Sequence, residues 1–260
     1  MSFVSCPEKN RNKRRDQNFL IENSRMARKF NLYADKNKTV NFLSLPARDW
    51  IFEEHIVEEF PDTKFCFWGS ERDPAEHEFA KVRAEEFNDK YHGRATFQMT
   101  LNPGKLYEAL TRHKQTGIPE DHEFDVIYAD YCGYLNPSVM NDINAILSNP
   151  KNNGPSQIFA LTFGLNTRNS IPHVRKIISN WEFSLNFKGI EVNDDRQDIK
   201  LDKGTYSEMP VELLKALACE LQHRAENNQN NKAGFLKVHT PHIYYSNNKP
   251  FGTIACNRAF

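Results

Sequence analysis

The sequence predicts an α/β protein, a three-layer sandwich in which a mostly parallel sheet has helices on both faces and closes with an antiparallel hairpin. Short apolar runs alternate with helix-length amphipathic segments, as in parallel strands joined by crossover helices. The four clearest runs are mostly apolar, as expected for strands covered on both faces. Each run ends in a polar cluster. These runs lie at 39–45, 64–70, 124–129 and 157–163.

The composition is that of a globular intracellular protein. The 260 residues include 19 Phe, enough for a full core, and the mean hydropathy is −0.70. We find no apolar run of about 18 residues and no secretory leader, so we expect no membrane association. The five cysteines are scattered, and no pair has metal-ligand spacing. We therefore expect a cytoplasmic protein with free thiols and without a metal site.

The N-terminal part, residues 1–38, is predicted to be a basic arm followed by a helix at 16–33, with the main domain at 39–260. Residues 1–40 contain ten Lys or Arg and four acidic residues, and five of the basic ones fall within 9–15. We expect residues 1–15 to be disordered or arm-like. Such an arm could contact nucleic-acid phosphates, or it could be a solvated tail.

The remaining elements follow from capping and turn residues. Asp73 and Pro74 are a strong helix start, because an acid caps the helix and proline fits its first position. Residues 182–203 are polar and acid-rich, and could be an insertion or a substrate loop. The expected helices lie at 49–60, 73–91, 103–114, 136–148, 171–180 and 210–225; the further strands lie at 95–99, 235–239, 242–245 and 252–256.

The polar clusters predict where a ligand would bind. In open α/β sheets, ligands bind outside the carboxyl ends of the strands. The polar residues at 46–49, 71–73 and 130–134 fall at those ends. We therefore expect the ligand site to be bordered by these clusters.

Five strand–helix units followed by a terminal hairpin resemble the class I S-adenosylmethionine-dependent methyltransferase family, over residues 39–260. The resemblance implies a Rossmann-like fold with a seven-stranded sheet whose final strand is antiparallel. It also implies S-adenosylmethionine as the cofactor. Glu71 stands where family members place the acid that accepts both ribose hydroxyls, with Arg72 beside it. Glu71 could instead be only a helix-capping acid.

Two other cofactor-binding segments depart from the family pattern. The turn after the first strand has no glycine, although the family uses glycine there to let the backbone approach the cofactor. Pro46, Ala47 and Arg48 stand in its place, and Arg48 could pair with a carboxylate. After the third strand, Thr100 offers a neutral group where an acid often meets the adenine amine.

The fourth-strand cluster, 130–134, is expected to border the methyl acceptor. Asp130 would lie near the methionine end of the cofactor and could orient or deprotonate an amine, while Tyr131 and Tyr134 could stack on a base. The cluster lacks the two prolines of amino-directed nucleic-acid methyltransferases. Cys132 could act as a nucleophile, as in pyrimidine C5 enzymes, or be a small packed residue.

A short sequence match to a second family lies before the first predicted strand. Residues 14–20 resemble the Gln-Asn-Phe segment of ribosomal RNA adenine dimethyltransferases. The resemblance implies that Gln17 and Asn18 border the cofactor, directly after the basic run.

Three functions remain open from the sequence. The first is an S-adenosylmethionine-dependent methyltransferase acting on a nucleic-acid base, RNA or DNA. The alternative is a non-catalytic methyltransferase-like binding or structural protein, favoured by the missing glycines. The third is a nucleotide-binding enzyme of another Rossmann-like family, with no Gly-x-Gly-x-x-Gly for a dinucleotide. The acceptor, the methylated atom and the oligomeric state are not determined by the sequence.

Overall fold

The structure is a computed structural model of the chain. It describes residues 7–46, 50–134, 137–148, 157–165, 193–194, 214–215, 217–218, 221, 236–239, 241–246 and 249–258. The helix predicted at 171–180 and the loop predicted at 182–203 lie outside these ranges, except for 193–194.

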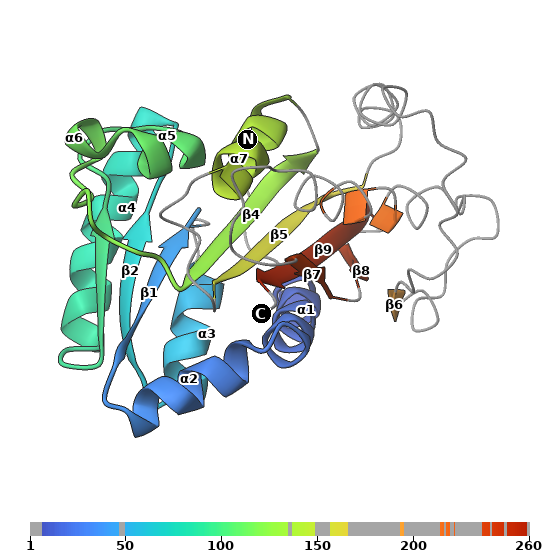
Figure 1. Cartoon of the computed structure of the whole chain (residues 1–260), viewed down its shortest axis with the longest axis horizontal. Coiled ribbons are helices and arrows are strands. Elements are labelled where there is room, and N and C mark those ends of the chain that lie inside the picture. The colour runs from blue at the N-terminus through green and yellow to red at the C-terminus, as the bar shows by residue number, and fades with distance from the viewer. Residues whose placement is uncertain are drawn as a thin grey trace.

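The sheet has the predicted class and topology. Its order is β3-β2-β1-β4-β5-β9-β8-β6, with β7 beside β9 (Figure 1). Parallel pairing joins the first five strands, which are β1 (Thr39–Ser44), β2 (Lys64–Gly69), β3 (Ala95–Met99), β4 (Val126–Tyr134) and β5 (Ile158–Gly164). The crossover helices between them enforce this direction, since parallel strands need long connections.

The closing hairpin confirms the prediction for the end of the chain. Strand β9 (Lys249–Arg258) inserts between β5 and β8 (His242–Ser246) and runs antiparallel to both. Two short strands, β6 (Asn193–Asp194) and β7 (Leu236–Val238), join the seven longer ones within the described residues. The arrangement is the Rossmann-like fold that the resemblance implied.

Helices cover the sheet on both faces and form two apolar cores. One core unites the sheet with α2 (Met26–Asp35), α3 (Ile51–Glu59) and α4 (Pro74–Lys90). The other unites it with α5 (Leu106–Thr111), α7 (Pro137–Ser148) and the helical residues Leu214, Leu217, Ala218 and Leu221. Figure 1 shows α1, α2 and α3 together at one side of the sheet, with α5 and α7 at the other.

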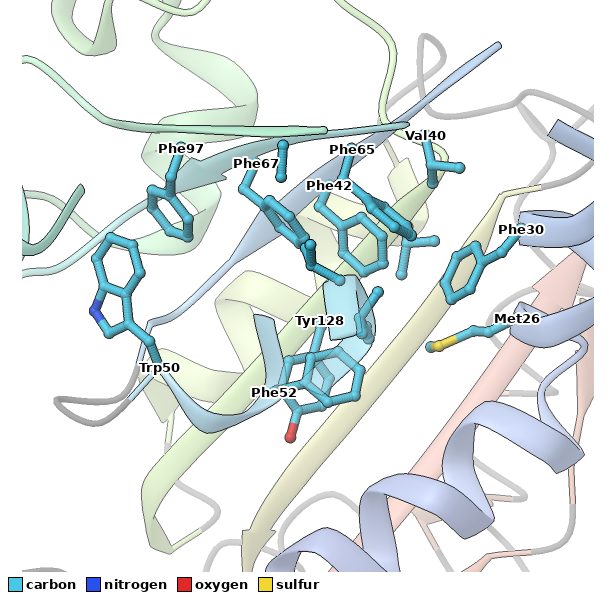
Figure 2. Close-up of a cluster of buried hydrophobic side chains, with 14 of the residues drawn as sticks. Met26, Phe30, Val40, Phe42, Trp50, Phe52, Phe65, Phe67, Phe97 and Tyr128 are labelled. Atoms are coloured by element: carbon cyan, nitrogen blue, oxygen red, sulfur yellow. The ribbon is translucent and has the colours of Figure 1, made fainter. Parts of the chain in front are cut away.

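The first core is dominated by aromatic side chains. Phe67 is central, with ring centroids 5.0 Å from Phe42 and 5.7 Å from Phe97, and the Trp50 ring lies 3.9 Å from that of Phe97 (Figure 2). Aromatic pairs at these separations add stability beyond their buried area. Gly69 at the end of β2 fits closely into this packing, because a Cβ there would lie 2.5 Å from Met99 Sδ and 2.7 Å from Phe97 Cε1 and would force these side chains to shift.

The N-terminal segment differs from its prediction. Residues 7–15 are not a disordered arm; they form the first half of helix α1 (Pro7–Asn23). A second helix, α2, follows after a break at Arg25, whose φ is 67°. The helix extends toward the N-terminus because one of its faces is buried: Asp16, Gln17, Leu20 and Ile21 are all covered, and α1 packs against β8.

Other boundaries confirm or adjust the predictions. The Asp73 carboxylate caps α4 by accepting hydrogen bonds from the amides of Ala75 and Glu76, at 2.9 and 3.1 Å. The helix predicted at 103–114 is divided into α5 and α6 (His113–Thr116). Asp49, the first residue of the helix predicted at 49–60, lies outside the described residues.

Strand β4 is longer than predicted. The run at 124–129 was expected to end before the polar cluster, but β4 continues to Tyr134 because β5 still pairs with it. Asp130 faces Thr162 in register, and Tyr134 faces Gly164, so the register shifts between the two pairs. The pairing of β4 with β5 is therefore irregular between these two positions.

Candidate functional site

The carboxyl ends of the central strands meet at one edge of the sheet, as predicted. The Ser70 amide donates a hydrogen bond to the Ser44 carbonyl at 3.1 Å, and the Leu45 amide donates to the Tyr128 carbonyl at 3.2 Å. These bonds bring together the ends of β1, β2 and β4. Pro46 is buried at this edge, whereas Ala47 and Arg48 lie outside the described residues.

Glu71 stands directly beyond β2, as predicted. Its Oε1 accepts a hydrogen bond from the Asp73 amide at 2.8 Å, and its carbonyl accepts one from the Gly104 amide at 2.8 Å. The backbone is therefore fixed while Oε2 makes no hydrogen bond to any described residue. The Glu71 carboxylate is thus held in place through Oε1, and Oε2 can accept a hydrogen bond from a ligand hydroxyl, which suits recognition of a diol. Arg72 beside it is exposed.

Thr100 follows β3 and is buried. Its hydroxyl donates to the Asn102 carbonyl at 3.0 Å, and its own carbonyl accepts a hydrogen bond from His77 Nε2 at 2.7 Å. The side chain therefore shapes the loop after β3, and its predicted cofactor contact stays a prediction.

Asp130 is paired with a residue of the basic run. Lys13 Nζ on α1 lies 2.6 Å from Asp130 Oδ2, with the two side chains 13% and 7% exposed. The ion pair joins the predicted basic arm, which could contact phosphates or be a solvated tail, to the residue expected to border the methyl acceptor. Lys13 is directed toward the site and not toward solvent.

Tyr131 points away from Asp130. Its hydroxyl donates to Asp142 Oδ2 on α7 at 2.7 Å, and Asp142 Oδ1 accepts from the Tyr107 amide at 2.9 Å. Burial, then the neighbouring Asp142, raises the pKa of Tyr131. Asp130 and Tyr131 therefore serve opposite faces of the sheet and do not converge. The side chains of Cys132 and Tyr134 lie outside the described part of the structure.

Gln17 and Asn18 lie on different faces of α1. Asn18 is exposed, and its Oδ1 is 2.6 Å from His55 Nε2 of α3. Gln17 is 0% exposed, and neither Oε1 nor Nε2 has a hydrogen-bond partner among the described residues. A buried amide with both polar atoms unsatisfied is costly, and such groups commonly meet a ligand or ordered water.

Three buried polar residues near this edge, Asp16, His242 and Glu53, were not predicted. Asp16 accepts hydrogen bonds from His242 Nδ1 at 2.6 Å and Thr253 Oγ1 at 2.8 Å. Burial raises the pKa of Asp16, and the His242 contact opposes the shift. Glu53, in the first turn of α3, is 2% exposed, and burial raises its pKa to about 7.

A helical period could have revealed part of this cluster. Lys13, Asp16 and Gln17 are three and four positions apart and share one face of a helix. Treating residues 1–15 as an arm hid that face. The contacts with His242 and Glu53 depend on distant segments and leave no local signal.

The described part of the chain has neither a membrane-spanning helix nor a metal cluster. None of its helices is long and apolar enough to cross a membrane. Within the described ranges, no group of three or more His, Cys, Asp or Glu is arranged to hold a metal ion. Of the described cysteines, Cys66 and Cys256 are free, and burial raises the pKa of both thiols.

Comparison with known proteins finds similarity of structure only. No family model matches the sequence, and no curated protein matches it. A Klebsiella pneumoniae protein assigned as an O-methyltransferase has a TM-score of 0.46 at 12% identity, covering 99% of this chain and 92% of that one. The methyltransferase domain of bacterial CtHen1-C has a TM-score of 0.44 at 8% identity, with coverages of 92% and 100%.

Mitomycin 7-O-methyltransferase MmcR has a TM-score of 0.41 at 12% identity. This chain spans about half of its length, 49%, while 85% of this chain is covered. At TM-scores below 0.5, the assignment of the fold rests on the strand order and register described above.

Proposed function

We propose that this protein is an S-adenosylmethionine-dependent methyltransferase with a nucleic-acid acceptor. The observation that carries the cofactor assignment is Glu71, whose carboxylate is anchored through one oxygen at the end of β2 while the other is open. The unsatisfied amide of Gln17 adds a second polar group that suits a ligand at this edge. The glycine-free turn after β1 is the departure from the family pattern.

The bound cofactor would supply an already activated methyl group, so the protein's main task is to align the acceptor. Glu71 would hold the ribose, and Asp130 would orient or deprotonate the acceptor. Lys13 would hold the Asp130 carboxylate in a fixed position through their ion pair.

Calorimetric titration with S-adenosylmethionine and S-adenosylhomocysteine tests the cofactor assignment. Loss of a charged hydrogen-bond partner costs about 1.5–3 kcal/mol, so Glu71→Gln should weaken binding by roughly ten-fold or more. Glu78→Gln is the matched control, since Glu78 is an exposed acid on α4. Absence of binding by the wild type, or an equal dissociation constant in both variants, would contradict the cofactor assignment.

The acceptor assignment rests on the outer face of α1. Arg11 and Arg14 are exposed and three positions apart, on the helix whose inner face brings Lys13 to Asp130. Neighbouring cations on one helix face suit phosphate contacts, and the same helix borders the proposed acceptor position beside Asp130. A nucleic-acid strand held on α1 would therefore lie close to that carboxylate.

Anisotropy of labelled single-stranded RNA and duplex DNA across a salt series tests this acceptor. Removing one cation that binds a phosphate should reduce the slope of log K against log salt by about 0.7–0.9. The double variant Arg11→Ser/Arg14→Ser should therefore flatten the slope, whereas Arg28→Ser on α2 should leave it unchanged. Equal salt slopes in the wild type and both variants would contradict the proposal of a nucleic-acid acceptor. Deleting residues 1–15 is unsuitable, because it removes half of α1.

A non-catalytic methyltransferase-like protein is the second candidate. Two features favour it. The Asp130 carboxylate, which was predicted to orient the acceptor, is already paired with Lys13, and the turn after β1 has no glycine. Binding of the cofactor without transfer of labelled methyl groups to total RNA or DNA would favour this candidate.

A further inference from the structure

Strand β3 is the last strand at one end of the sheet, with β2 as its neighbour. Successive residues of a strand direct their backbone N–H and C=O groups to opposite edges. The Thr100 amide, just beyond β3, donates a hydrogen bond to the Gly69 carbonyl of β2 at 2.9 Å. The odd-numbered residues, with Phe97 in the middle, therefore direct their backbone groups away from β2. An edge of this kind is a template for pairing with another chain.

The side chain of Asn88 on α4 occupies the outer edge of β3. The Phe97 amide donates a hydrogen bond to Asn88 Oδ1 at 2.6 Å, and Asn88 Nδ2 donates one to the Phe97 carbonyl at 3.0 Å. In an antiparallel sheet, two directly opposed residues exchange the same two bonds. Because the Asn side chain carries the donor and the acceptor of a peptide group, it takes the place that a residue of a partner strand would fill.

Neighbouring segments close the two ends of the same edge. The Ala95 amide donates a hydrogen bond to the Tyr91 carbonyl at the end of α4, at 3.0 Å. The Leu101 amide, beyond the other end of β3, donates one to the Thr116 carbonyl of α6 at 2.9 Å. These two bonds leave the middle of the strand to Asn88.

The composition of β3 makes protection of this edge necessary. Its five residues are Ala-Thr-Phe-Gln-Met, without a charge or a proline. Charged residues and prolines are common devices that keep an edge strand from pairing, and uncharged segments with β-branched and aromatic residues associate readily. Alanine would favour the helix more than Asn88 does. The residue type at position 88 is therefore explained by the strand and not by α4.

We propose that Asn88 covers an interaction surface: it keeps the β3 edge of one copy of this chain from pairing with the β3 edge of a second copy. Antiparallel pairing of two identical strands has two-fold symmetry, so the edge is complementary to itself. Without the Asn88 amide, Phe97 of each copy would exchange both backbone hydrogen bonds with Phe97 of the other. The exposed Thr96 and Gln98 side chains would then lie opposite each other across the pair. The proposal is independent of the proposed function.

Hydrogen exchange of the full chain, followed by NMR, tests whether Asn88 covers Phe97. The Phe97 amide should exchange slowly in the wild type. Asn88→Ala removes both bonds, so this amide should exchange roughly ten-fold faster at a dilution at which the variant is monomeric. The Gln98 amide, which faces β2, should keep its wild-type rate. Glu85→Ala is the matched control, because Glu85 is an exposed residue of the same helix.

Sedimentation velocity across a concentration series tests the pairing with a second copy. The mass of Asn88→Ala should rise with concentration above that of the wild type and of Glu85→Ala. Adding Thr96→Lys and Gln98→Lys should restore wild-type sedimentation, because like charges opposite each other disfavour pairing. Wild-type sedimentation of Asn88→Ala at every concentration, or association that survives the two lysine substitutions, overturns the proposal. Fast exchange of the Phe97 amide in the wild type also overturns it, even if no variant folds.

Discussion

The Asp16 carboxylate and the His242 ring lie 2.6 Å apart, although 226 positions separate them in the chain. The pair is almost fully buried and attaches α1 to the closing hairpin. The Phe19 ring stacks on the same histidine, with centroids 4.4 Å apart. The N-terminal helix is therefore held against the edge of the sheet where Lys13 meets Asp130.

Asp16→Ala should destabilise the protein strongly. Removing one partner of a buried pair leaves the other uncompensated and costs roughly 3–5 kcal/mol. Thr253→Val removes two hydrogen bonds, one to Asp16 and one with Thr162, and should cost about 2 kcal/mol. Urea unfolding monitored by fluorescence measures both. Glu22→Ala, on the exposed side of α1, is the control, and a loss in it equal to that of Asp16→Ala would contradict the prediction.

Glu53 should make stability fall as pH rises through neutrality. The usual pKa of the side chain is 4.5, and burial raises it to about 7 in the folded protein. Between these values the folded state binds more protons than the unfolded state, so the free energy of unfolding decreases as pH rises. Above the window, the loss is on the order of 3 kcal/mol.

Glu53→Gln should remove that dependence. The variant should match the wild type in mildly acidic buffer and be more stable in mildly alkaline buffer, as measured by urea unfolding across a pH series. Glu59→Gln, an exposed acid on the same helix, should follow the wild-type curve. Parallel curves for wild type and Glu53→Gln would show that Glu53 ionises normally.

Gln17→Leu should separate stability from ligand binding. The variant removes two buried polar atoms that no described residue satisfies, which should raise the free energy of unfolding by about 1–3 kcal/mol. It should also weaken S-adenosylmethionine binding if the amide serves the ligand. Thermal unfolding and calorimetry measure the two effects, with Glu22→Ala on the exposed side of α1 as the control. A less stable variant would mean that the amide has a partner in the folded protein.

Phe67→Ala should be among the most damaging changes in the core. Phe67 lies between Phe42 and Phe97 and is fully buried, so truncation should cost about 3–5 kcal/mol through reduced burial and a cavity. Phe79→Ala is the matched control, since Phe79 is 40% exposed. Similar unfolding midpoints for the two variants would contradict the packing in Figure 2.

The sequence by itself determined the fold class, the strand runs and the closing hairpin. These features depend on local patterns: apolar runs of strand length, the Asp73 cap of α4, and the order of strands and helices along the chain. Glu71 was placed correctly beyond β2 for the same reason, because a residue after a strand stays at that strand's end. Its role in cofactor binding remains a prediction.

Only the tertiary structure decided what the charged residues of α1 do. A count of basic residues cannot tell whether a lysine faces solvent or a carboxylate of the sheet, so Lys13 was placed in an arm that could contact phosphates or be a solvated tail. Asp16, Glu53 and His242 were missed because their partners come from distant segments. Whether a charged side chain is buried, and which residue it pairs with, depends on how helices and strands from distant parts of the chain pack together.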